Sequence, residues 1–247
     1  MRRVLLVMFT IFFIAMPCFA GGVVSMASDP WPPFADPAHP HGGLSVEIAK
    51  AAFGTQGYTV TMEFMPWARV IQTVSLGELD LVAGAWMSDE RKENFMFSEP
   101  FLINEIRFIK RKGDPFKYSG LETLPGLKVG VIRSYSYSDE FMNYPGVIIE
   151  PVNNFITNIR KLVAGRIDLT LEDEIVGMNS LSILDPALAG NIEFTGPSLA
   201  SKPLYVLSGL KNPRHKEIIE AFNKGLKEIK ANGTYDRIMA SYGMKQL

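Results

Sequence analysis

The chain has 247 residues, of which 47% are hydrophobic and 21% are charged, and its formal net charge is -1. This length allows one large domain or two small ones, each with a substantial core. The composition is that of an ordinary soluble globular protein. The nearly neutral charge gives no reason to expect a nucleic acid or an acidic membrane surface as a partner.

Residues 1–20 have the pattern of a secretory signal peptide. Arg2 and Arg3 precede an apolar run over residues 4–15, which is too short to span a membrane, and the segment ends on Ala20. We therefore expect cleavage after Ala20 and export to the periplasm. The one cysteine of the chain leaves with this segment, so the mature protein needs no disulfide.

The first part of the mature chain predicts alternating strands and helices. Hydrophobic periodicity predicts strands over residues 23–27 and 58–64 and helices over residues 44–53 and 66–74. Prolines around Trp31 fix an extended loop directly after the first strand. Trp31 on this loop and Trp67 at a helix start could each belong to the core or contact a ligand, and both interpretations stay open. No cysteine or well-spaced acid completes a metal site with His39 and His41.

The stretch over residues 77–101 carries the first functional signal. A short apolar strand ends at Gly84, and Ser88 then caps a short helix whose first turn is acidic. Arg91 is therefore expected just past a strand end, where open α/β sheets bind their ligands. A guanidinium there can hold a carboxylate through two parallel hydrogen bonds. The alternative is a surface Arg91 that pairs with an acid of its own helix.

Residues 165–174 repeat this pattern with the opposite charge. A Gly-x-Ile-Asp turn leads into a strand over residues 167–171, and Glu172, Asp173 and Glu174 follow where that strand ends. The first copy ends on a base and the second on acids. Two similar α/β units with opposite charges at equivalent ends suggest two lobes that face each other across a cleft. A ligand with both a carboxylate and an ammonium group would fit between them.

The rest of the chain completes the two units. We expect strands over residues 105–110, 127–132, 147–150 and 203–208, and helices over residues 153–164 and 213–231. Ser136 follows one of these strands, and the hydroxyl and backbone N–H groups around it make a reasonable anion cradle. Thr234 is expected to cap a last short helix.

Several short motifs, taken in order along the mature chain, resemble extracellular solute-binding protein family 3, the polar amino acid receptors of ABC importers. Each motif is weak alone, and together they cover the full mature length. The motifs are Trp31-Pro32-Pro33-Phe34, Gly77-Glu78-Leu79-Asp80, Asp89-Glu90-Arg91-Lys92, Phe97-Ser98-Glu99-Pro100-Phe101, Lys128-Val129-Gly130-Val131, Gly165-Arg166-Ile167-Asp168 and Asn232-Gly233-Thr234-Tyr235-Asp236-Arg237-Ile238.

The resemblance implies an α/β protein with the two-lobed periplasmic binding protein-like (type II) fold and two hinge strands. Lobe 1 would hold residues 21–110 with 205–247, and lobe 2 would hold residues 111–204. It further implies a periplasmic receptor that captures a small polar ligand, an amino acid, and delivers it to the membrane subunits of an ABC permease. We expect no catalytic residue, cofactor or metal, and we expect a monomer.

The resemblance also assigns roles to residues of the cleft. In such proteins an arginine at the position of Arg91 binds the α-carboxylate, and an aspartate at the position of Asp173 takes the α-ammonium. The other candidate site residues are Trp31 and Trp67, which stack on the ligand side chain, Gly84, Ala85 and Ser136, which complete the cradle, and Trp86 and Tyr135, which are bulkier than the residues usual in the family.

Two other functions stay open at this level. Periplasmic cyclohexadienyl dehydratases resemble the same family, and the adjacent Glu172 and Asp173 could supply a general acid for such an enzyme. A stand-alone sensor that presents its closed form to a membrane receptor is the second alternative.

Overall fold

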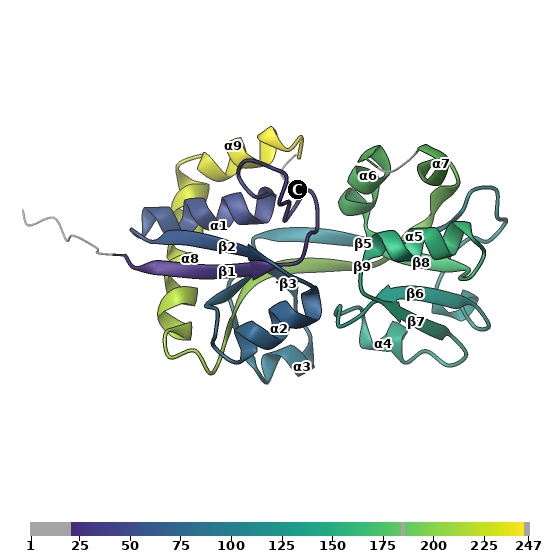
Figure 1. The fold of residues 1–247 in the computed structure, drawn as a ribbon, viewed down its shortest axis with the longest axis horizontal. Coiled ribbons are helices and arrows are strands. Elements are labelled where there is room, and N and C mark those ends of the chain that lie inside the picture. The colour runs from purple at the N-terminus through teal and green to yellow at the C-terminus, as the bar shows by residue number, and fades with distance from the viewer. Residues whose placement is uncertain (1–20, 184–185, 245–247) are drawn as a thin grey trace, which may run out of the picture.

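The computed structural model describes residues 21–183 and 186–244. The predicted signal peptide lies outside these residues. Two lobes lie side by side, and two long strands run between them (Figure 1). No helix of the described part is both long and apolar enough to cross a membrane. The expected α/β fold, with two lobes and two hinge strands, is confirmed.

Lobe 1 is built on a parallel group of three strands. β1 (Val23–Ser28) pairs in parallel with β2 (Thr59–Phe64) and β3 (Leu81–Trp86). Side chains alternate along a strand, so neighbouring residues of β1 belong to different apolar clusters. Met26 lies in the cluster that includes residues of the helices at 44–55 and 215–231, and Ala27 lies in the cluster that includes residues of the helix at 67–75. The other elements of this lobe are α1 (Leu44–Thr55), α2 (Trp67–Ser75), α3 (Asp89–Lys92), β4 (Phe95–Phe97), α8 (His215–Ala231) and α9 (Thr234–Ser241).

Lobe 2 repeats this plan with a smaller parallel group. β6 (Lys128–Ile132) pairs in parallel with β7 (Ile148–Val152) and β8 (Leu169–Asp173). Ile132 and Ile159 belong to the apolar cluster that holds α5 on this sheet. The remaining elements are a 3-10 helix (Leu121–Thr123), α4 (Asp139–Met142), α5 (Phe155–Val163), α6 (Glu174–Ile183) and α7 (Pro186–Ala189).

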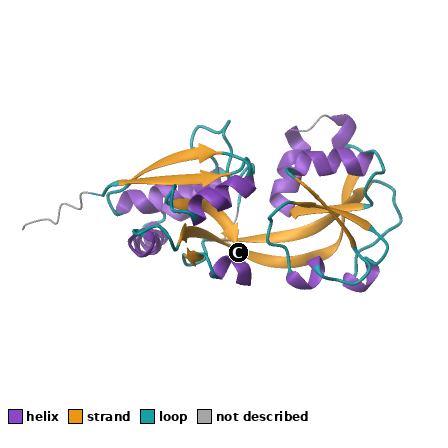
Figure 2. Cartoon of the chain, turned by 60° about the horizontal axis from the view of Figure 1, so that its bottom comes forward, coloured by secondary structure: helices purple, strands orange, loops and turns teal. Residues whose placement is uncertain are grey.

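The two hinge strands are β5 (Leu102–Arg111) and β9 (Ile192–Gly209), which pair antiparallel along their length. β9 also pairs with β3 of lobe 1, and β5 pairs with β8 of lobe 2. One sheet therefore runs through the molecule in the order β2-β1-β3-β9-β5-β8-β6-β7. Figure 2 shows both long strands crossing from one lobe to the other. Because both strands belong to both lobes, the lobe boundaries after residues 110 and 204 stay predictions.

Several sequence predictions differ from the observed elements. β3 does not end at Gly84 but continues to Trp86, and Gly84 lies where the pairing of β3 with β9 shifts register. A Cβ at Gly84 would lie 3.2 Å from Leu204 Cδ2, so this glycine admits a close neighbour rather than a strand end. β9 begins well before the predicted residues 203–208. The N-cap of α9 is Gly233, with φ of 74°, and not Thr234.

Candidate functional site

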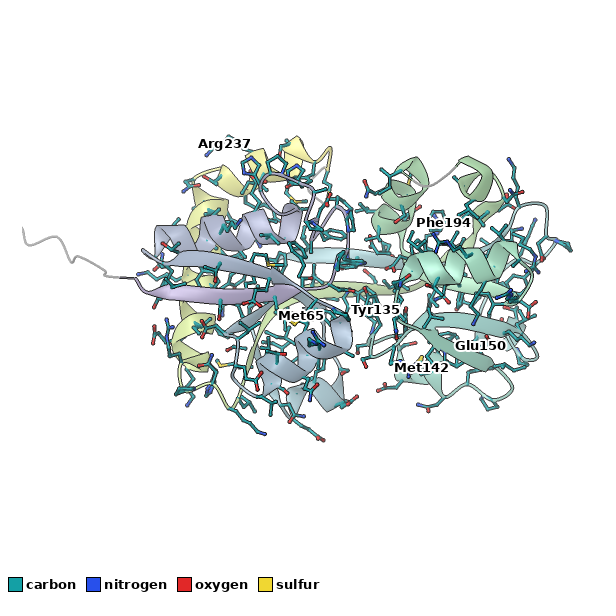
Figure 3. All side chains as sticks on the ribbon, viewed as in Figure 1. Met65, Tyr135, Met142, Glu150, Phe194 and Arg237 are labelled. Atoms are coloured by element: carbon teal, nitrogen blue, oxygen red, sulfur yellow. The ribbon has the colours of Figure 1, made fainter. Side chains whose placement is uncertain are left out.

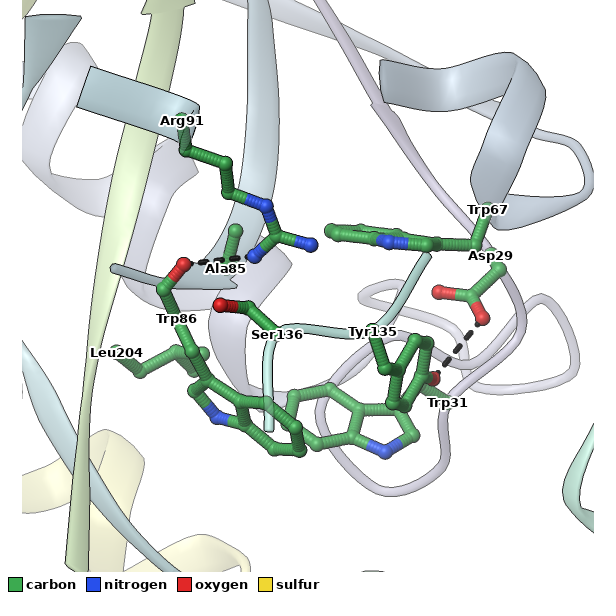
Figure 4. Close-up of a pocket in the computed structure, with 10 residues that line it drawn as sticks. Asp29, Trp31, Trp67, Ala85, Trp86, Arg91, Tyr135, Ser136 and Leu204 are labelled. Atoms are coloured by element: carbon green, nitrogen blue, oxygen red, sulfur yellow. Dashed lines mark hydrogen bonds between the residues drawn. The ribbon is translucent and has the colours of Figure 1, made fainter. Parts of the chain in front are cut away.

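A small cavity lies between the two lobes, at the carboxyl end of β3 (Figure 4). Lobe 2 contributes to it through the turn that follows β6, and lobe 1 and the hinge strand β9 supply the rest. The lining residues are Asp29, Trp31, Trp67, Gly84, Ala85, Trp86, Arg91, Tyr135, Ser136 and Leu204. Every residue that the sequence nominated for the site lines this cavity except Asp173, and their individual roles stay predictions.

Arg91 reaches the cavity from α3, which Ser88 caps by accepting the Arg91 backbone N–H at 3.2 Å. Its guanidinium is buried. Nη1 donates to the Trp86 carbonyl at 2.6 Å, and Nη2 donates to the Ser134 carbonyl at 2.8 Å. Neither partner is charged, and among the described residues no carboxylate forms an ion pair with Arg91. Loss of water lowers the pKa of Arg91 to about 10. The surface alternative is wrong, since Arg91 is buried and Asp89 pairs instead with Lys92 at 2.7 Å.

Asp29 is a member of the site that the sequence reasoning missed. It follows β1 directly, and its carboxylate accepts the Tyr135 hydroxyl at 3.1 Å. Burial raises the pKa of Asp29 to about 7, against the lowering effects of the Tyr135 hydrogen bond and of Arg91. An acid directly after a strand, ahead of the proline loop, is the signal that could have found it.

Four aromatic side chains form the walls of the cavity. The rings of Trp67 and Trp86 lie 5.7 Å and 5.5 Å from that of Tyr135, both edge-on, and Trp31 lies 5.8 Å from Trp86. Each indole N–H donates to an acceptor of the protein, and the acceptors of Trp31 and Trp67 belong to lobe 2. The acceptors are Glu172 Oε1 for Trp31, the Ser134 carbonyl for Trp67 and Asn104 Oδ1 for Trp86.

The turn that follows β6 joins lobe 2 to the lobe 1 side of the cavity. The Ser134 carbonyl accepts from both Arg91 and Trp67, the Tyr135 hydroxyl donates to Asp29, and the Ser136 hydroxyl donates to the Met87 carbonyl at 3.4 Å. Figure 3 shows Tyr135 at the junction of the lobes, beside Met65. The site is therefore coupled directly to contact between the lobes.

Asp173 lies away from this cavity. Because β8 extends through Asp173, the alternation of side chains sends Glu172 and Asp173 to opposite faces of the strand. The Asp173 carboxylate accepts the backbone N–H of Glu105 at 3.1 Å and of Val176 at 3.0 Å, in the first turn of α6. Burial raises the pKa of Asp173 to about 6. Its place is thus structural, between a hinge strand and a helix start.

The described residues offer no site for a metal ion, since no three His, Cys, Asp or Glu side chains come together there. His39 instead lies against Tyr242, whose hydroxyl is 3.1 Å from His39 Nδ1. The polar chemistry of the cavity consists of one guanidinium, one carboxylate, and hydroxyl and peptide groups.

Two lobes joined by hinge strands, with a charged and aromatic cavity between them, define the class of solute-binding proteins. The model of the bacterial extracellular solute-binding proteins, family 3, matches residues 23–245, and the chain belongs to this family. The family, and the relatives described next, are named for binding, so the chain is a solute-binding protein.

Relatives and solved structures agree with this assignment. The lysine/arginine/ornithine-binding periplasmic protein of Escherichia coli K12 is 29% identical over 168 residues, 66% of this chain and 63% of that protein. The chain thus spans less than two thirds of that relative. The histidine-binding periplasmic protein of the same organism is 23% identical over 207 residues, 81% of this chain and 78% of that protein. An ancestral arginine-binding protein bound to arginine superposes with a TM-score of 0.77 at 26% identity, over 90% of this chain and 98% of the other.

Proposed function

We propose that the protein is a periplasmic receptor for a small amino acid, which it captures between its lobes for import by an ABC permease. One observation carries this proposal. The buried guanidinium of Arg91 bonds only to peptide carbonyls and faces the carboxylate of Asp29 across a small aromatic cavity (Figure 4). A buried cation without a counter-ion is costly, and a ligand carboxylate would supply the missing charge.

In this proposal Arg91 and Asp29 hold the two charged groups of the ligand. The ligand carboxylate binds near the point where Arg91 Nη2 and Trp67 Nε1 converge, now filled by the Ser134 carbonyl oxygen. The ammonium lies toward Asp29, which takes the role that the sequence gave to Asp173. An ammonium there lowers the pKa of Asp29 and so favours its ionised form.

The aromatic walls and the backbone would complete recognition. Trp31, Trp67, Trp86 and Tyr135 offer ring faces and edges to the ligand side chain, worth about 1–2 kcal/mol where that side chain is cationic. Gly84 and Ala85 bring backbone to the cavity, and Ser136 brings a hydroxyl.

The remaining parts of the proposal are export and partners. We infer that residues 1–20 direct export and are cleaved after Ala20, an inference supported by relatives named as periplasmic. The protein then acts as a monomer, and its closed, liganded form docks on the permease subunits. Hinge closure is the motion expected for lobes linked by two strands.

A thermal-shift screen of residues 21–247 tests the function. The panel holds the common amino acids, ornithine, small dicarboxylates and polyamines. A ligand at 100 times its dissociation constant adds about 2.7 kcal/mol of stability, which raises the melting temperature by a few degrees. Stabilisation by one class of amino acids supports the proposal and names the ligand class. A flat response to every amino acid, confirmed by calorimetry, would overturn it.

A further inference from the structure

Trp86 is the cavity tryptophan whose indole bond does not depend on lobe 2. Trp31 and Trp67 both donate to acceptors of lobe 2, so these two bonds break when the lobes separate. The indole N–H of Trp86 donates instead to Oδ1 of Asn104, at 2.9 Å, and this bond is buried. The Trp86 ring is therefore fixed by a different part of the molecule from the other two.

Asn104 lies on the hinge strand β5, on the lobe 1 side of an irregularity. The register of β5 against β9 shifts between Ile106 and Phe108, which lie farther toward lobe 2. A bend at that point would move lobe 2 and leave Asn104 beside Trp86. Since β9 lies between β3 and β5 in the sheet, the side-chain bond reaches across one strand and ties the end of β3 to the hinge. The bond thus holds the ring before a ligand arrives as well as afterwards.

The position of the Trp86 ring sets the shape of the cavity. Its centre lies 5.8 Å from that of Trp31 and 5.5 Å from that of Tyr135 (Figure 4). The backbone carbonyl of the same residue accepts Arg91 Nη1 at 2.6 Å. One residue therefore joins the guanidinium to the aromatic wall, and its ring limits the room left for a ligand side chain next to Arg91.

Asn104 is polar at a position where stability alone favours an apolar residue. Leu102 and Ile106, two residues away on either side, are buried on the same face of β5, and Asn104 has no exposed surface. Its Nδ2 has no hydrogen-bond partner among the described residues, although the amide lies near enough to Asp173 to act against the rise of that carboxyl's pKa. A buried donor without a partner destabilises the fold. The contribution of this amide is its bond to Trp86.

We propose that Asn104 is a positioning residue, which holds the Trp86 ring from the hinge strand and thereby restricts the site to amino acids with short side chains. The inference rests on the proposed function, because Arg91 must hold the ligand carboxylate, and it adds a limit on side-chain length. A ring held at its nitrogen and packed edge-on against Tyr135 cannot turn aside for a longer chain. Without the bond the ring is free to adopt other rotamers, and a longer side chain can displace it.

The test compares L-alanine, L-norvaline and L-norleucine, whose unbranched side chains lengthen step by step, by titration calorimetry on residues 21–247. For the native sequence we expect affinity to fall by about tenfold or more from L-alanine to L-norleucine. Asn104→Leu removes the acceptor and keeps the ring, so this difference should shrink to about threefold or less, mainly through tighter binding of L-norleucine. Asn223→Leu is the control, since Asn223 accepts the Glu99 backbone N–H outside the cavity, and it should keep the difference.

Two further readouts separate positioning from a general effect on the fold. The chain has three tryptophans, so an isotope-labelled sample gives three indole N–H signals in its NMR spectrum, and Trp86→Phe identifies one of them. Asn104→Leu should move that signal and leave those of Trp31 and Trp67 in place. Adding Asn104→Leu to Trp86→Phe should change the affinities no further, because both changes remove the same interaction.

Equal affinity of the native protein for L-alanine and L-norleucine, or a difference that survives in Asn104→Leu, would overturn the inference while the Arg91 site stands. An unmoved Trp86 signal in Asn104→Leu would overturn it as well. If none of the three amino acids binds the native protein, the limit on side-chain length is wrong, and the thermal-shift screen decides separately whether the proposed function stands.

Discussion

Arg91 is the residue whose environment is hardest to explain without a ligand. It carries a positive charge into a site where its hydrogen-bond partners are the carbonyls of Trp86 and Ser134 and where the Trp67 ring lies 5.2 Å from its Cζ. Peptide dipoles and a ring face offset part of the lost hydration, the carboxylates of Glu90 and Asp29 act on the guanidinium, and no described carboxylate forms a direct ion pair with it. That combination is typical of a position that receives an anion.

Replacing Arg91 tests this interpretation. Arg91→Ala should weaken the amino acid identified by the screen by about 2–5 kcal/mol, as for other buried charge pairs. Arg91→Lys should recover only part of the loss, because an ammonium cannot hold a carboxylate through two parallel bonds. Calorimetry measures both, with Lys92→Ala on the exposed side of α3 as control. Unchanged affinity in Arg91→Ala would refute the carboxylate clamp.

The buried acids predict how stability depends on pH. The pKa of Glu172 is raised from 4.5 to about 8 and that of Asp29 from 3.8 to about 7, both mainly by burial. An acid whose pKa is higher in the folded state than in the unfolded state binds its proton more tightly when the protein is folded. Its contribution to the free energy of unfolding is therefore complete below the unfolded-state pKa and is lost as the pH rises through the folded-state pKa. Without ligand, the free energy of unfolding should fall between about pH 5 and pH 8.5, by an amount on the order of a few kcal/mol.

Urea unfolding across that range measures the effect. Glu172→Gln cannot ionise, so its stability should depend less on pH than that of the native sequence. Stability that rises over the same range, or an identical dependence in the variant, would show that Glu172 is ionised in the folded protein.

At the scale of single elements, the extent of β8 decides which acid belongs to the cleft. The strand continues through Asp173, so Glu172 turns toward Trp31 and Asp173 turns toward the start of α6. There Asp173 also accepts a backbone N–H of the hinge strand β5. A carboxylate that caps a helix and ties it to a hinge acts on stability rather than on recognition.

Asp173→Asn should therefore change stability, whereas Asp29→Asn should change ligand affinity. Asp173→Asn should lower the free energy of unfolding by about 1 kcal/mol, with ligand affinity nearly constant, because it perturbs a cap. Asp29→Asn should weaken the amino acid ligand at least tenfold while sparing a carboxylate that lacks the ammonium. Chemical unfolding and calorimetry on both variants check this. A selective loss of amino acid binding in Asp173→Asn would restore the role that the sequence assigned to it.

For the whole molecule, lobe contact and ligand capture share the same residues. Ser134, Tyr135 and Ser136 lie on one turn of lobe 2, and all three hydrogen-bond to lobe 1. Ser134 adopts a left-handed backbone conformation, with φ of 63°, which is uncommon outside glycine. A ligand that bonds both to this turn and to Arg91 would favour the closed arrangement through its differential affinity.

Tyr135→Phe removes one bridge between the lobes and leaves the ring in place. The unliganded variant should populate more open molecules, with a larger radius of gyration in small-angle scattering and a smaller shape change on saturation with ligand than Tyr144→Phe, a tyrosine outside the cavity. Ligand affinity should fall several-fold, because less of the protein starts closed. Identical scattering from both variants would show that the Tyr135 hydroxyl does not hold the lobes together.

Local sequence signals predicted most of the succession of elements and the two-lobed class, but not β4, α6 or α7. Periodic apolar residues, the cap at Ser88 and short motifs are local signals, and the structure places the residues they nominated, Arg91, Trp31, Trp67 and Trp86, around one cavity. The predicted length of β9 was too short because a register shift in its pairing with β5 interrupts the two-residue period.

The tertiary structure alone decided which acid faces Arg91. Asp29 and Tyr135 meet across 106 positions of sequence, and Trp31 and Glu172 across 141, so no local pattern could pair them. The resemblance assigned the ligand ammonium to Asp173, but β8 continues through Asp173 and its alternation turns Glu172 toward Trp31 and Asp173 toward the start of α6. Burial, which sets the charge state of Asp29 and Glu172, likewise comes from the packing of both lobes rather than from either stretch of chain.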